Sequence, residues 1–507
     1  MNTTFYSLAA RGLGAELVKI EVENYASQPG TVIVGLGDKA VQESKERVRA
    51  AIKNCDFFYP RGKVVINLAP ADLPKSGPCF DLPIALGLIA LGNDWSVNCD
   101  STVFFGELTL DGRLQHVNGI LGLAAEAKAR GFLRVVVPSS DAAEAALIPD
   151  LEIYGADDLI QVVQFLRGEV QLRREFQTVS PHDPFLPDSN SVDMVDIKGQ
   201  AQAKRALEIA AAGSHNVLLC GSPGSGKTLL ARSLRSILPA LSLQESLEVT
   251  KLYSLCGMLP QGQTLIRQRP FRTIHHTASA TAIVGGGSVP RPGEISLAHR
   301  GVLFMDELAE FPSSVLEALR QPVEDRQITI SRASGSLTYP SQFLLCGAMN
   351  PCPCGFYQVP HSKKACECLP YQITRYQGRL SGPLMDRIDL HCAVSPLEQS
   401  DFSALPSGDT SEAVRERVNS ARERQRLRFE GMSLAVNAEM STKDLERLCP
   451  LSAESKNILE LAVESLHLSA RGYYRVIRVA RTIADLQACE GISVAHVSEA
   501  LQYRRRE

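Results

Sequence analysis

The feature that most constrains this chain is an eight-residue segment, 221–228, with the sequence Gly-Ser-Pro-Gly-Ser-Gly-Lys-Thr. It matches every fixed position of the phosphate-binding pattern G-x-x-x-x-G-K-[ST]. An apolar run at 216–220 precedes the segment and a helical pattern at 229–238 follows it. Strand, loop and helix therefore come in the order that a P-loop needs, with the strand expected to be a buried parallel one.

A P-loop binds the phosphates of a nucleotide mainly through its backbone. Glycines let several N–H groups converge on the phosphates, and the following helix directs the positive end of its dipole at them. Lys227 is expected to reach the β- and γ-phosphates, and the Thr228 hydroxyl to coordinate Mg²⁺. The sequence thus predicts an ATP and Mg²⁺ site, whose nucleotide-binding residues are Gly221, Ser222, Pro223, Gly224, Ser225, Gly226, Lys227 and Thr228.

Two further apolar runs end in polar residues suited to ATP hydrolysis. The run at 301–305 leads into Asp306 and Glu307, about 80 residues beyond the P-loop, which is typical of a Walker B element. Asp306 is expected to hold Mg²⁺ and Glu307 to activate the attacking water. The run at 343–349 leads into Asn350, which is predicted to position that water as sensor 1. The alternative is that Asn350 only caps the following turn.

Length and composition indicate a globular protein of several domains. A single core rarely extends over 507 residues. The chain is 44% hydrophobic and 21% charged with a formal net charge of −3, and DNA binding would need only a local basic surface. No apolar run approaches the roughly 18–20 residues of a membrane span. The first residues lack a secretory signal, and most of the 13 cysteines are scattered in apolar runs. We therefore expect a cytoplasmic protein without a membrane partner.

Composition along the chain predicts an α/β multidomain protein. Residues 1–170 combine expected strands, such as 64–68 and 134–137, with expected helices at 40–52, 82–91 and 121–130. A Pro-rich, polar stretch at 171–195 is the expected linker. Residues 196–395 contain the nucleotide motifs, with a Cys-rich insert at 350–370, and residues 396–507 have helical patterns only.

Longer motifs give the chain a family resemblance over nearly its whole length. They are Arg-Pro-Gly-Glu-Ile-Ser-Leu-Ala-His at 291–299, Asn-Pro-Cys-Pro-Cys-Gly at 350–355, Leu-Ser-Gly-Pro-Leu-Met-Asp-Arg-Ile-Asp-Leu-His at 380–391 and Ser-Ala-Arg-Gly-Tyr at 469–473. In these segments the chain resembles the ComM/YifB family of magnesium-chelatase-related AAA+ ATPases. The resemblance implies a three-layer αβα ATPase core with a C-terminal helical lid. It also implies a homohexameric ring with ATP between subunits.

The same resemblance implies an activity and two arginine roles. The activity is ATP-driven translocation on single-stranded and branched DNA. The protein would then be a helicase that promotes branch migration during natural transformation. Arg387 would be the arginine finger that reaches a neighbour's γ-phosphate, the alternative being a surface arginine paired with Asp386 or Asp389. Arg471 would be the sensor-2 arginine, and Arg475 or Arg478 would take that role in a different register.

The N-terminal domain resembles the Lon-protease fold. The likeness rests on Pro-Lys-Ser-Gly-Pro-Cys at 74–79 and Gly-Glu-Leu-Thr-Leu-Asp-Gly-Arg at 106–113. In those proteases a serine is paired with a lysine, and here Cys79 and Leu121 stand at the two positions. A nucleophile needs a nearby base or charge for activation. The domain is therefore predicted to be inactive as a peptidase and to act as a structural or DNA-guiding tier.

The Cys-rich insert predicts a metal site. Cys352 and Cys354 form one thiol pair, and Cys366 and Cys368 form another after 11 intervening residues. Four thiolates can close a tetrahedral Zn²⁺ site, although a single residue inside each pair departs from the usual C-x₂-C spacing. His361 is a substitute ligand. The alternative is four reduced thiols without metal.

Arginines near two expected loops are the candidates for DNA contact. Residues 326–340 predict a hairpin with a turn at 333–335, which places Arg332 near its tip. In related ring helicases a hairpin at this place enters the pore of the ring. Arg269 and Arg272 belong to a candidate second pore loop at 267–291, which also contains His275, His276 and a Gly-Gly-Gly run. The alternative for each arginine is a solvated surface charge. The Arg-rich stretch 412–428 is predicted to be a solvated helix with intrahelical ion pairs.

Two other functions fit the same motifs. A magnesium-chelatase motor would use the ATPase core to drive metal insertion into a tetrapyrrole. A protein-remodelling AAA+ ATPase would use the N-terminal domain to bind polypeptide clients. The Lon-like domain favours the DNA translocase over the chelatase motor.

Overall fold

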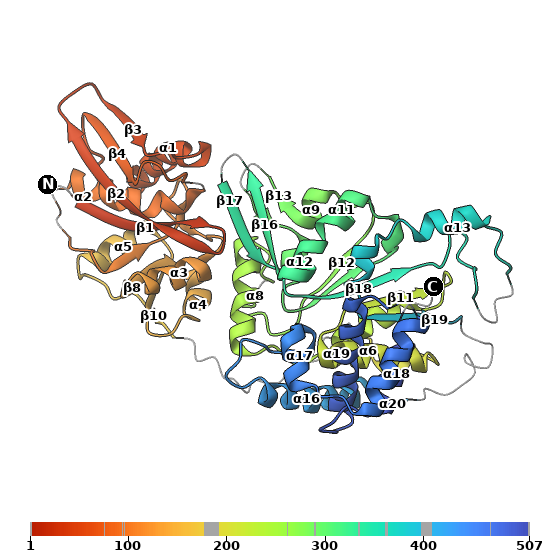
Figure 1. The fold of residues 1–507 in the computed structure, drawn as a ribbon. Helices are drawn as coiled ribbons and strands as arrows, with labels where there is room; N and C mark the ends of the chain where they lie inside the picture. Colours follow the sequence, from red (N-terminus) through yellow and green to blue (C-terminus); the bar gives the residue numbers. More distant parts are fainter. Residues whose placement is uncertain are drawn as a thin grey trace. The chain divides into compact units, whose positions relative to one another are not determined.

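The computed structural model describes residues 3–75, 77–93, 95, 97–176, 192–260, 262–287, 290–332, 335–359, 364–396, 408–466 and 468–504. The chain divides into two compact units (Figure 1). The first comprises Met1–Asp183 and Leu243–Ile266, and the second comprises Pro184–Ser242 and Arg267–Glu507. The chain therefore passes between the units three times, at 183–184, 242–243 and 266–267.

The first unit is built on two four-stranded sheets. In the sheet ordered β1-β2-β4-β3, the strand pair β3/β4 is parallel and the others are antiparallel. In the sheet ordered β10-β9-β8-β5, only the edge strand β10 is antiparallel. The strands of the unit are β1 (Thr3–Arg11), β2 (Gly14–Tyr25), β3 (Gly30–Val34), β4 (Lys63–Ala69), β5 (Thr102–Phe104), β6 (Glu107–Leu108), β7 (Leu114–Gln115), β8 (Arg134–Pro138), β9 (Glu152–Ala156) and β10 (Arg174–Glu175).

Helices fill the core of the first unit. The helix α2 is apolar all round and is buried along most of its length, as expected for a central helix. Its one acid, Asp81, accepts a hydrogen bond from Arg47 at 2.9 Å, so the buried carboxylate keeps a charged partner. The helices are α1 (Lys39–Asn54), α2 (Asp81–Gly92), α3 (Ile120–Ala129), α4 (Ser139–Ala145), α5 (Leu159–Leu166) and α8 (Leu243–Leu255).

The helix α8 belongs to the first unit although it follows the P-loop in sequence. It packs against α3. Ser254 at its C-terminal end donates to the buried Glu144 carboxylate at 2.5 Å and accepts the Gly119 N–H at 3.1 Å. Burial raises the pKa of Glu144, and the Ser254 bond opposes that effect. Polar bonds of this kind within a buried interface specify where the helix docks.

The second unit is centred on a five-stranded parallel sheet with the order β12-β15-β18-β11-β19. Its inner strands are almost entirely buried, which explains their unbroken apolar runs. Because all five strands run the same way, the residues after β11, β15 and β18 meet at one edge of the sheet. The strands are β11 (Val217–Gly221), β12 (Phe271–Ile274), β15 (Val302–Met305), β18 (Leu344–Met349) and β19 (Leu390–Val394).

Two small antiparallel pairs lie outside this sheet. The strands β16 (Gln327–Arg332) and β17 (Gly335–Pro340) form a hairpin immediately before β18, with Arg332 opposite Gly335. The strands β13 (Gly285–Gly286) and β14 (Arg291–Pro292) form the other pair. Figure 1 shows the hairpin extending beyond the parallel sheet, close to β13 and α9 (Ala280–Val284). The predicted hairpin is therefore confirmed.

Helices cover the sheet and make up the C-terminal region. From α16 onward the described chain contains no strand, so the predicted helical C-terminus is confirmed. The remaining helices of the unit are α6 (Ala201–Gly213), α7 (Lys227–Ile237), α10 (Glu294–Leu297), α11 (Ser313–Ala318), α12 (Arg320–Asp325), α13 (Pro370–Gln377), α14 (Gly382–Met385), α16 (Ser411–Arg428), α17 (Thr442–Leu448), α18 (Ala453–Ser465), α19 (Ala470–Leu486) and α20 (Val494–Gln502).

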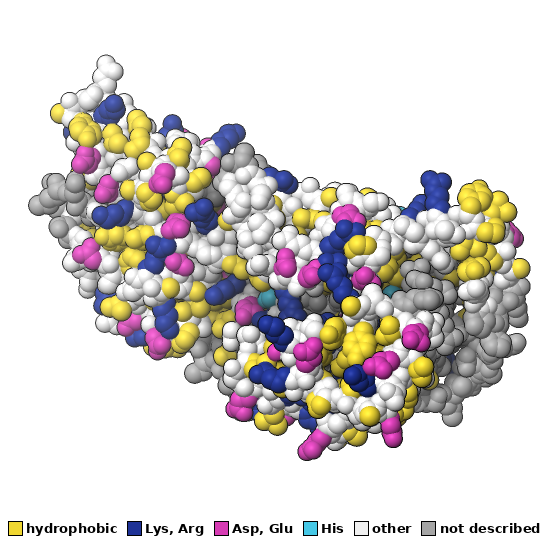
Figure 2. Space-filling model, in the orientation of Figure 1, with side chains coloured by type: hydrophobic (Ala, Val, Ile, Leu, Met, Phe, Trp, Pro, Cys, Tyr) yellow, Lys and Arg dark blue, Asp and Glu magenta, His cyan; other side chains and the backbone are white. Residues whose placement is uncertain are grey.

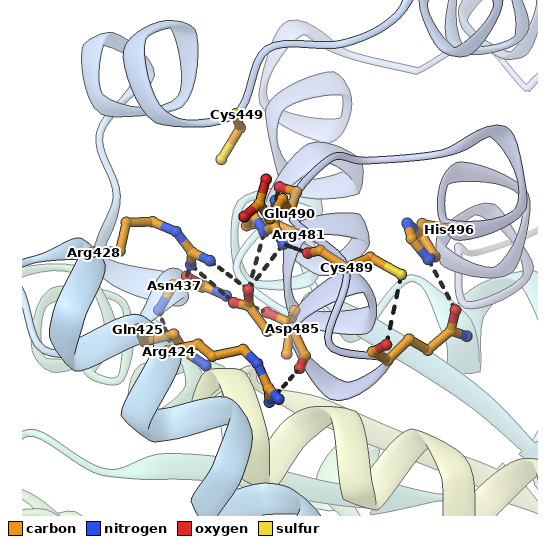
Figure 3. Close-up of polar contacts among 12 residues, drawn as sticks. Arg424, Gln425, Arg428, Asn437, Cys449, Arg481, Asp485, Cys489, Glu490 and His496 are labelled. Carbon is orange, nitrogen blue, oxygen red and sulfur yellow. Dashed lines mark hydrogen bonds and ion pairs between the residues drawn. The ribbon is translucent and has the colours of Figure 1, made fainter.

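A buried polar network joins α16 to α19 (Figure 3). The Asp485 carboxylate is fully buried and accepts hydrogen bonds from Arg428 and Asn437 at 2.8 Å and from Arg481 at 2.9 Å. Arg424 donates to the Asp485 carbonyl at 3.1 Å. With several charge-assisted bonds to one carboxylate, this network fixes the geometry of the helical region.

The prediction of a solvated, internally paired helix at 412–428 was wrong for most of its arginines. Arg417 donates to Glu208 of α6 at 2.6 Å, and Arg422 donates to the Ala211 carbonyl at 2.8 Å. Arg426 does make an intrahelical pair of the predicted kind, with Glu423 at 2.6 Å. Long arginine side chains can cross a helix surface to reach buried acceptors, which charge spacing along one helix does not reveal.

In the described part of the chain, no helix is long and apolar enough to cross a bilayer.

Candidate ATP site

The P-loop connects β11 to α7, as the motif predicts. Gly224 and Gly226 have φ values of +77° and +88°, which side chains with a Cβ rarely adopt. Gly221 has a different constraint, because a Cβ there would lie 2.3 Å from the Val394 carbonyl oxygen of β19. The helix α7 begins at Lys227, so its unpaired N–H groups face the loop.

Lys227 is held at the centre of the site by neutral oxygens. Its ammonium donates to the carbonyls of Gly221 and Ser222, both at 2.8 Å, and to the Asn350 side-chain oxygen at 3.1 Å. Burial lowers the pKa of Lys227, and the nearby Asp306 and Glu307 act against that shift. The contact with Asn350 brings the ends of β11 and β18 together around one cation.

The Walker B acids lie beside the P-loop threonine. The Thr228 hydroxyl donates to Asp306 at 3.1 Å, so a hydroxyl and a carboxylate converge as Mg²⁺ ligands do. Glu307 adopts the left-handed conformation, with φ of 52°. Its carboxylate lies 2.9 Å from Nδ1 of His276, which follows β12. This histidine therefore contacts the acid that is predicted to activate water.

These residues surround a cavity of about 530 Å³, within the range of about 300–1,000 Å³ that small-molecule sites have. ATP with Mg²⁺ fits it by two observations. The Ser225 hydroxyl is buried without a hydrogen-bond partner among the described residues, and a Cβ on Gly224 or Gly226 would meet nothing within 4 Å. The lining residues are Pro223, Gly224, Ser225, Gly226, Lys227, Thr228, Leu229, Arg232, Asp306, Glu307, Met349 and Asn350.

The predicted arginine finger and sensor-2 residues do not line this cavity, as far as the described chain shows. Arg387 is paired with Glu324 and donates to the Pro383 carbonyl at 2.6 Å, so its partner is neither Asp386 nor Asp389. Arg471 is exposed at the start of α19.

The two alternative sensor-2 residues lie deeper. Arg475 is buried with its Nε 3.4 Å from Asp389, and burial lowers the pKa of both Arg475 and Arg478. The positive charges of Arg387 and Arg471 also lower the pKa of Arg475. These arginines therefore form one cationic region apart from the P-loop.

Comparison with known proteins assigns the chain to a family. Three family models match the chain. The model described as magnesium chelatase, subunit ChlI, matches residues 193–402, and the one described as subunit ChlI of Mg-chelatase matches residues 20–141. The model of the magnesium chelatase subunit ChlI C-terminal region matches residues 408–504. Competence protein ComM of Haemophilus influenzae is 44% identical over 503 residues, covering 98% of this chain and 96% of the relative. The chain belongs to the ComM/YifB family of magnesium-chelatase-related AAA+ proteins.

Two other relatives show how the similarity is distributed. The uncharacterized protein YifB of Salmonella typhimurium is 43% identical over 501 residues, covering 98% of this chain and 96% of the relative. The magnesium-chelatase 38 kDa subunit of Rhodobacter capsulatus is 24% identical over 345 residues, covering 61% of this chain and 87% of that subunit. The family resemblance expected from the motifs is thus confirmed over the whole chain.

The three candidate DNA-binding arginines have different surroundings. Arg332 is exposed at the end of β16. Arg269 donates to the carbonyls of Pro239 at 2.6 Å and Arg300 at 2.7 Å, and Arg272 makes a bidentate pair with Glu294 at 2.6 and 2.7 Å. Both guanidinium groups are thus committed to contacts inside the unit, and we do not propose them as phosphate ligands.

Several residues of the site were missed from the sequence. His276 belongs to the segment 267–291 that the sequence predicts as a pore loop, and its contact with Glu307 depends on β12 lying beside β15. Arg232 and Leu229 line the cavity from α7. Arg232 lies four residues after Thr228, and that helical spacing was a usable signal.

The four cysteines of the insert come together as predicted. Their sulfur atoms all lie within 4.8 Å of one another. His361 lies outside the described residues.

In the first unit, Cys79 and Leu121 are both buried, and burial raises the pKa of the Cys79 thiol to about 12. A thiol with that pKa carries little thiolate at neutral pH.

Proposed function

We propose that this protein is an ATP-dependent DNA translocase and helicase that acts as a homohexamer. Its proposed role is branch migration of recombination intermediates during natural transformation. The observation that carries the proposal is the β16–β17 hairpin, which directly precedes the strand ending in Asn350 and presents Arg332 at its tip. The relative from Haemophilus influenzae, named a competence protein, supports the proposed context.

ATP hydrolysis is assigned to the residues around the cavity. Lys227 and the P-loop N–H groups would bind the phosphates, while Thr228 and Asp306 would hold Mg²⁺. The ion would supply positive charge against the charge that develops on the phosphate oxygens. Glu307 accepts a proton from the attacking water, and Asn350 orients that water. The pairing of Lys227 with Asn350 keeps both groups at the same end of the cavity.

A ring assembly explains why the arginines lie away from the cavity. Arg387 would approach the nucleotide of a neighbouring subunit, as an arginine finger does. Arg471, at the start of α19, would act as sensor 2. On this proposal each ATP site is completed by a second copy of the chain.

The first unit is proposed to be a Lon-like domain without peptidase activity. The buried, weakly acidic Cys79 thiol and the apolar Leu121 supply no activated nucleophile. We assign the domain a structural or DNA-guiding role on the ring.

DNA contact is proposed to be local rather than spread over a broad basic face. On the face drawn in Figure 2, Lys and Arg side chains are interspersed with Asp and Glu side chains. Six copies of one hairpin arginine around a pore would add their phosphate contacts, so a single arginine per subunit suffices.

The decisive experiment compares wild-type protein with Arg332→Ala and Arg332→Lys. ATP hydrolysis and movement of forked duplexes and Holliday junctions are measured at two salt concentrations. Arg332→Ala should keep its basal ATPase but lose DNA stimulation and show a smaller salt dependence of DNA binding, whereas Arg332→Lys should retain much of both.

A second candidate function is a magnesium-chelatase-type motor, which the three ChlI family models favour. A protein-remodelling ATPase is the other alternative. If wild-type protein with ATP and Mg²⁺ moves neither DNA substrate, and DNA leaves its ATPase rate unchanged, the translocase proposal fails in favour of these alternatives.

A further inference from the structure

The Cys-rich insert has the geometry of a closed metal site. The Cys352 sulfur lies 3.3 Å from that of Cys354 and 3.7 Å from that of Cys366, and the last two are 3.5 Å apart. Four thiolates bound to one zinc ion at about 2.3 Å would be separated by about 3.8 Å. A disulfide would instead need about 2.05 Å. The spacing therefore matches a tetrahedral sulfur site much better than a pair of disulfides.

Backbone N–H groups are directed at the sulfurs. The N–H groups of Gly355 and Tyr357 donate to the Cys352 sulfur at 3.2 and 3.4 Å, and the N–H of Cys354 donates to the Cys368 sulfur at 3.4 Å. Such donors stabilise the thiolate form, which is the form that binds metal. Backbone N–H groups of the insert thus converge on two of the four sulfurs.

The same insert touches the P-loop. Gly355 has a φ of +87°, and a Cβ on it would lie 2.4 Å from Cδ and 2.8 Å from Cγ of Pro223. Pro223 lines the ATP cavity. The close approach requires glycine at position 355 for both reasons, the left-handed conformation and the lack of space.

Two further contacts hold the start of the insert. Asn350, its first residue, accepts a hydrogen bond from Lys227 at 3.1 Å. Gln377 of α13, after the insert, donates to the Pro351 carbonyl at 3.0 Å. Residues 350–355 therefore run from the contact with Lys227, past Cys352 and Cys354, to the contact with Pro223 of the P-loop.

We propose that Cys352, Cys354, Cys366 and Cys368 bind one Zn²⁺ ion, and that the metal-closed loop braces the P-loop through the Gly355–Pro223 contact. Four sulfur ligands in a tetrahedron select zinc over the harder divalent cations. Zinc closes a loop that has little apolar mass of its own, and the closed loop holds Pro223 in the conformation that binds phosphate. The effect on nucleotide rests on the proposed ATP site, whereas zinc binding does not.

The experiment uses the full-length chain purified without chelators. Zinc is measured by mass spectrometry, and nucleotide affinity is measured with a fluorescent ATP analogue in Mg²⁺. Wild-type protein should contain about one zinc per chain. Cys366→Ser/Cys368→Ser should lose the metal and bind the nucleotide at least about tenfold more weakly.

A second variant separates the brace from the metal. Gly355→Ala leaves all four thiols in place, so it should retain zinc while its nucleotide affinity falls by about tenfold. Gly431→Ala is the matched control, because Gly431 also has a positive φ, +77°, but its Cβ would meet nothing within 4 Å. That variant should bind zinc and nucleotide like wild type.

Opposite results would overturn the proposal. Zinc well below one per chain in wild-type protein, or iron in its place, would remove the metal assignment. Unchanged nucleotide affinity in Gly355→Ala would remove the brace, even if the double cysteine variant failed to fold. None of these measurements involves DNA, so failure of the translocase proposal would leave them informative.

Discussion

At the scale of single residues, the surroundings of Lys227 and Glu307 suit them to different proposed steps, phosphate binding and water activation. Lys227 is surrounded by neutral oxygens, and no carboxylate neutralises its charge in an ion pair among the described contacts. Its charge therefore remains available to phosphate. Glu307 is half-exposed at the cavity, where a carboxylate can meet water rather than phosphate.

This difference predicts separable defects. Lys227→Ala should weaken nucleotide binding by about 100-fold or more, whereas Glu307→Gln should bind nucleotide normally and lose turnover by a similar factor. Equilibrium binding of a fluorescent nucleotide and steady-state phosphate release measure the two quantities. Normal turnover in Glu307→Gln would rule out its role as the base.

His116 predicts a pH dependence confined to the first unit. A hydrogen bond to Asp141, with Nδ1 2.6 Å from the carboxylate, raises the pKa of His116 to about 8. The folded state therefore favours the protonated ring, so the stabilisation is complete below about pH 6.5 and is lost as pH rises through 8. Because the His116 side chain is half exposed, solvent screening should limit this stabilisation to about 1 kcal/mol.

The single tryptophan, Trp95, lies in the first unit and reports its unfolding. Denaturant titrations followed by its fluorescence should show His116→Gln destabilised relative to wild type at pH 6 and nearly equal to it at pH 9. A difference of the same size at both pH values would contradict the predicted linkage.

At the scale of elements, a few close contacts lead from the hairpin toward Glu307. A Cβ on Gly285 would lie 2.5 Å from Ile330, and one on Gly286 would lie 2.9 Å from the Arg332 guanidinium. The helix α9 ends at Val284, directly before Gly285, and His276 lies a few residues before its start. Because His276 contacts Glu307, a displacement of β16 has a short physical route to the proposed water-activating group.

This route predicts that His276 restrains Glu307 until DNA engages the hairpin. His276→Ala should raise basal ATP turnover by about three- to tenfold and reduce its stimulation by DNA, with nucleotide affinity unchanged. Phosphate release with and without forked DNA measures both. A lower basal rate with intact DNA stimulation would show that His276 supports catalysis directly.

At the scale of the whole molecule, the proposed ring assembly would make Arg387 and Lys227 members of one site on different subunits. Arg387→Ala alone should keep nucleotide affinity and lose turnover by about 10³-fold. Mixing it in equal amounts with Lys227→Ala should restore activity, because about a quarter of randomly formed interfaces then combine an intact lysine with an intact arginine. Steady-state ATPase of mixed and unmixed variants provides the measurement.

A control is needed because Arg387 also contacts its own subunit. Glu324→Ala removes the carboxylate that pairs with Arg387 but leaves the arginine in place, so its ATPase should remain close to wild type. Loss of turnover in Glu324→Ala, or no recovery in the mixture, would indicate that Arg387 serves the fold of its own subunit instead.

Much of the ATP site was predictable from local sequence. The P-loop, β15 with Asp306 and Glu307, and β18 with Asn350 follow from apolar runs ending in polar residues, because parallel strands bring their ends to one edge. The hairpin around Arg332 was predictable from its alternation and turn residues. These features depend on short stretches of chain whose geometry is set by backbone chemistry.

Long-range packing decided the rest. The sequence by itself determined the P-loop and its strands, the family, and the presence of four thiols able to bind one metal. Only the tertiary structure placed α8 in the first unit, committed Arg269 and Arg272 to internal partners, and set His276 against Glu307 and Gly355 against Pro223. Each of these contacts joins residues distant in sequence, and the partner of a polar side chain depends on which elements pack together rather than on its own neighbours in the chain.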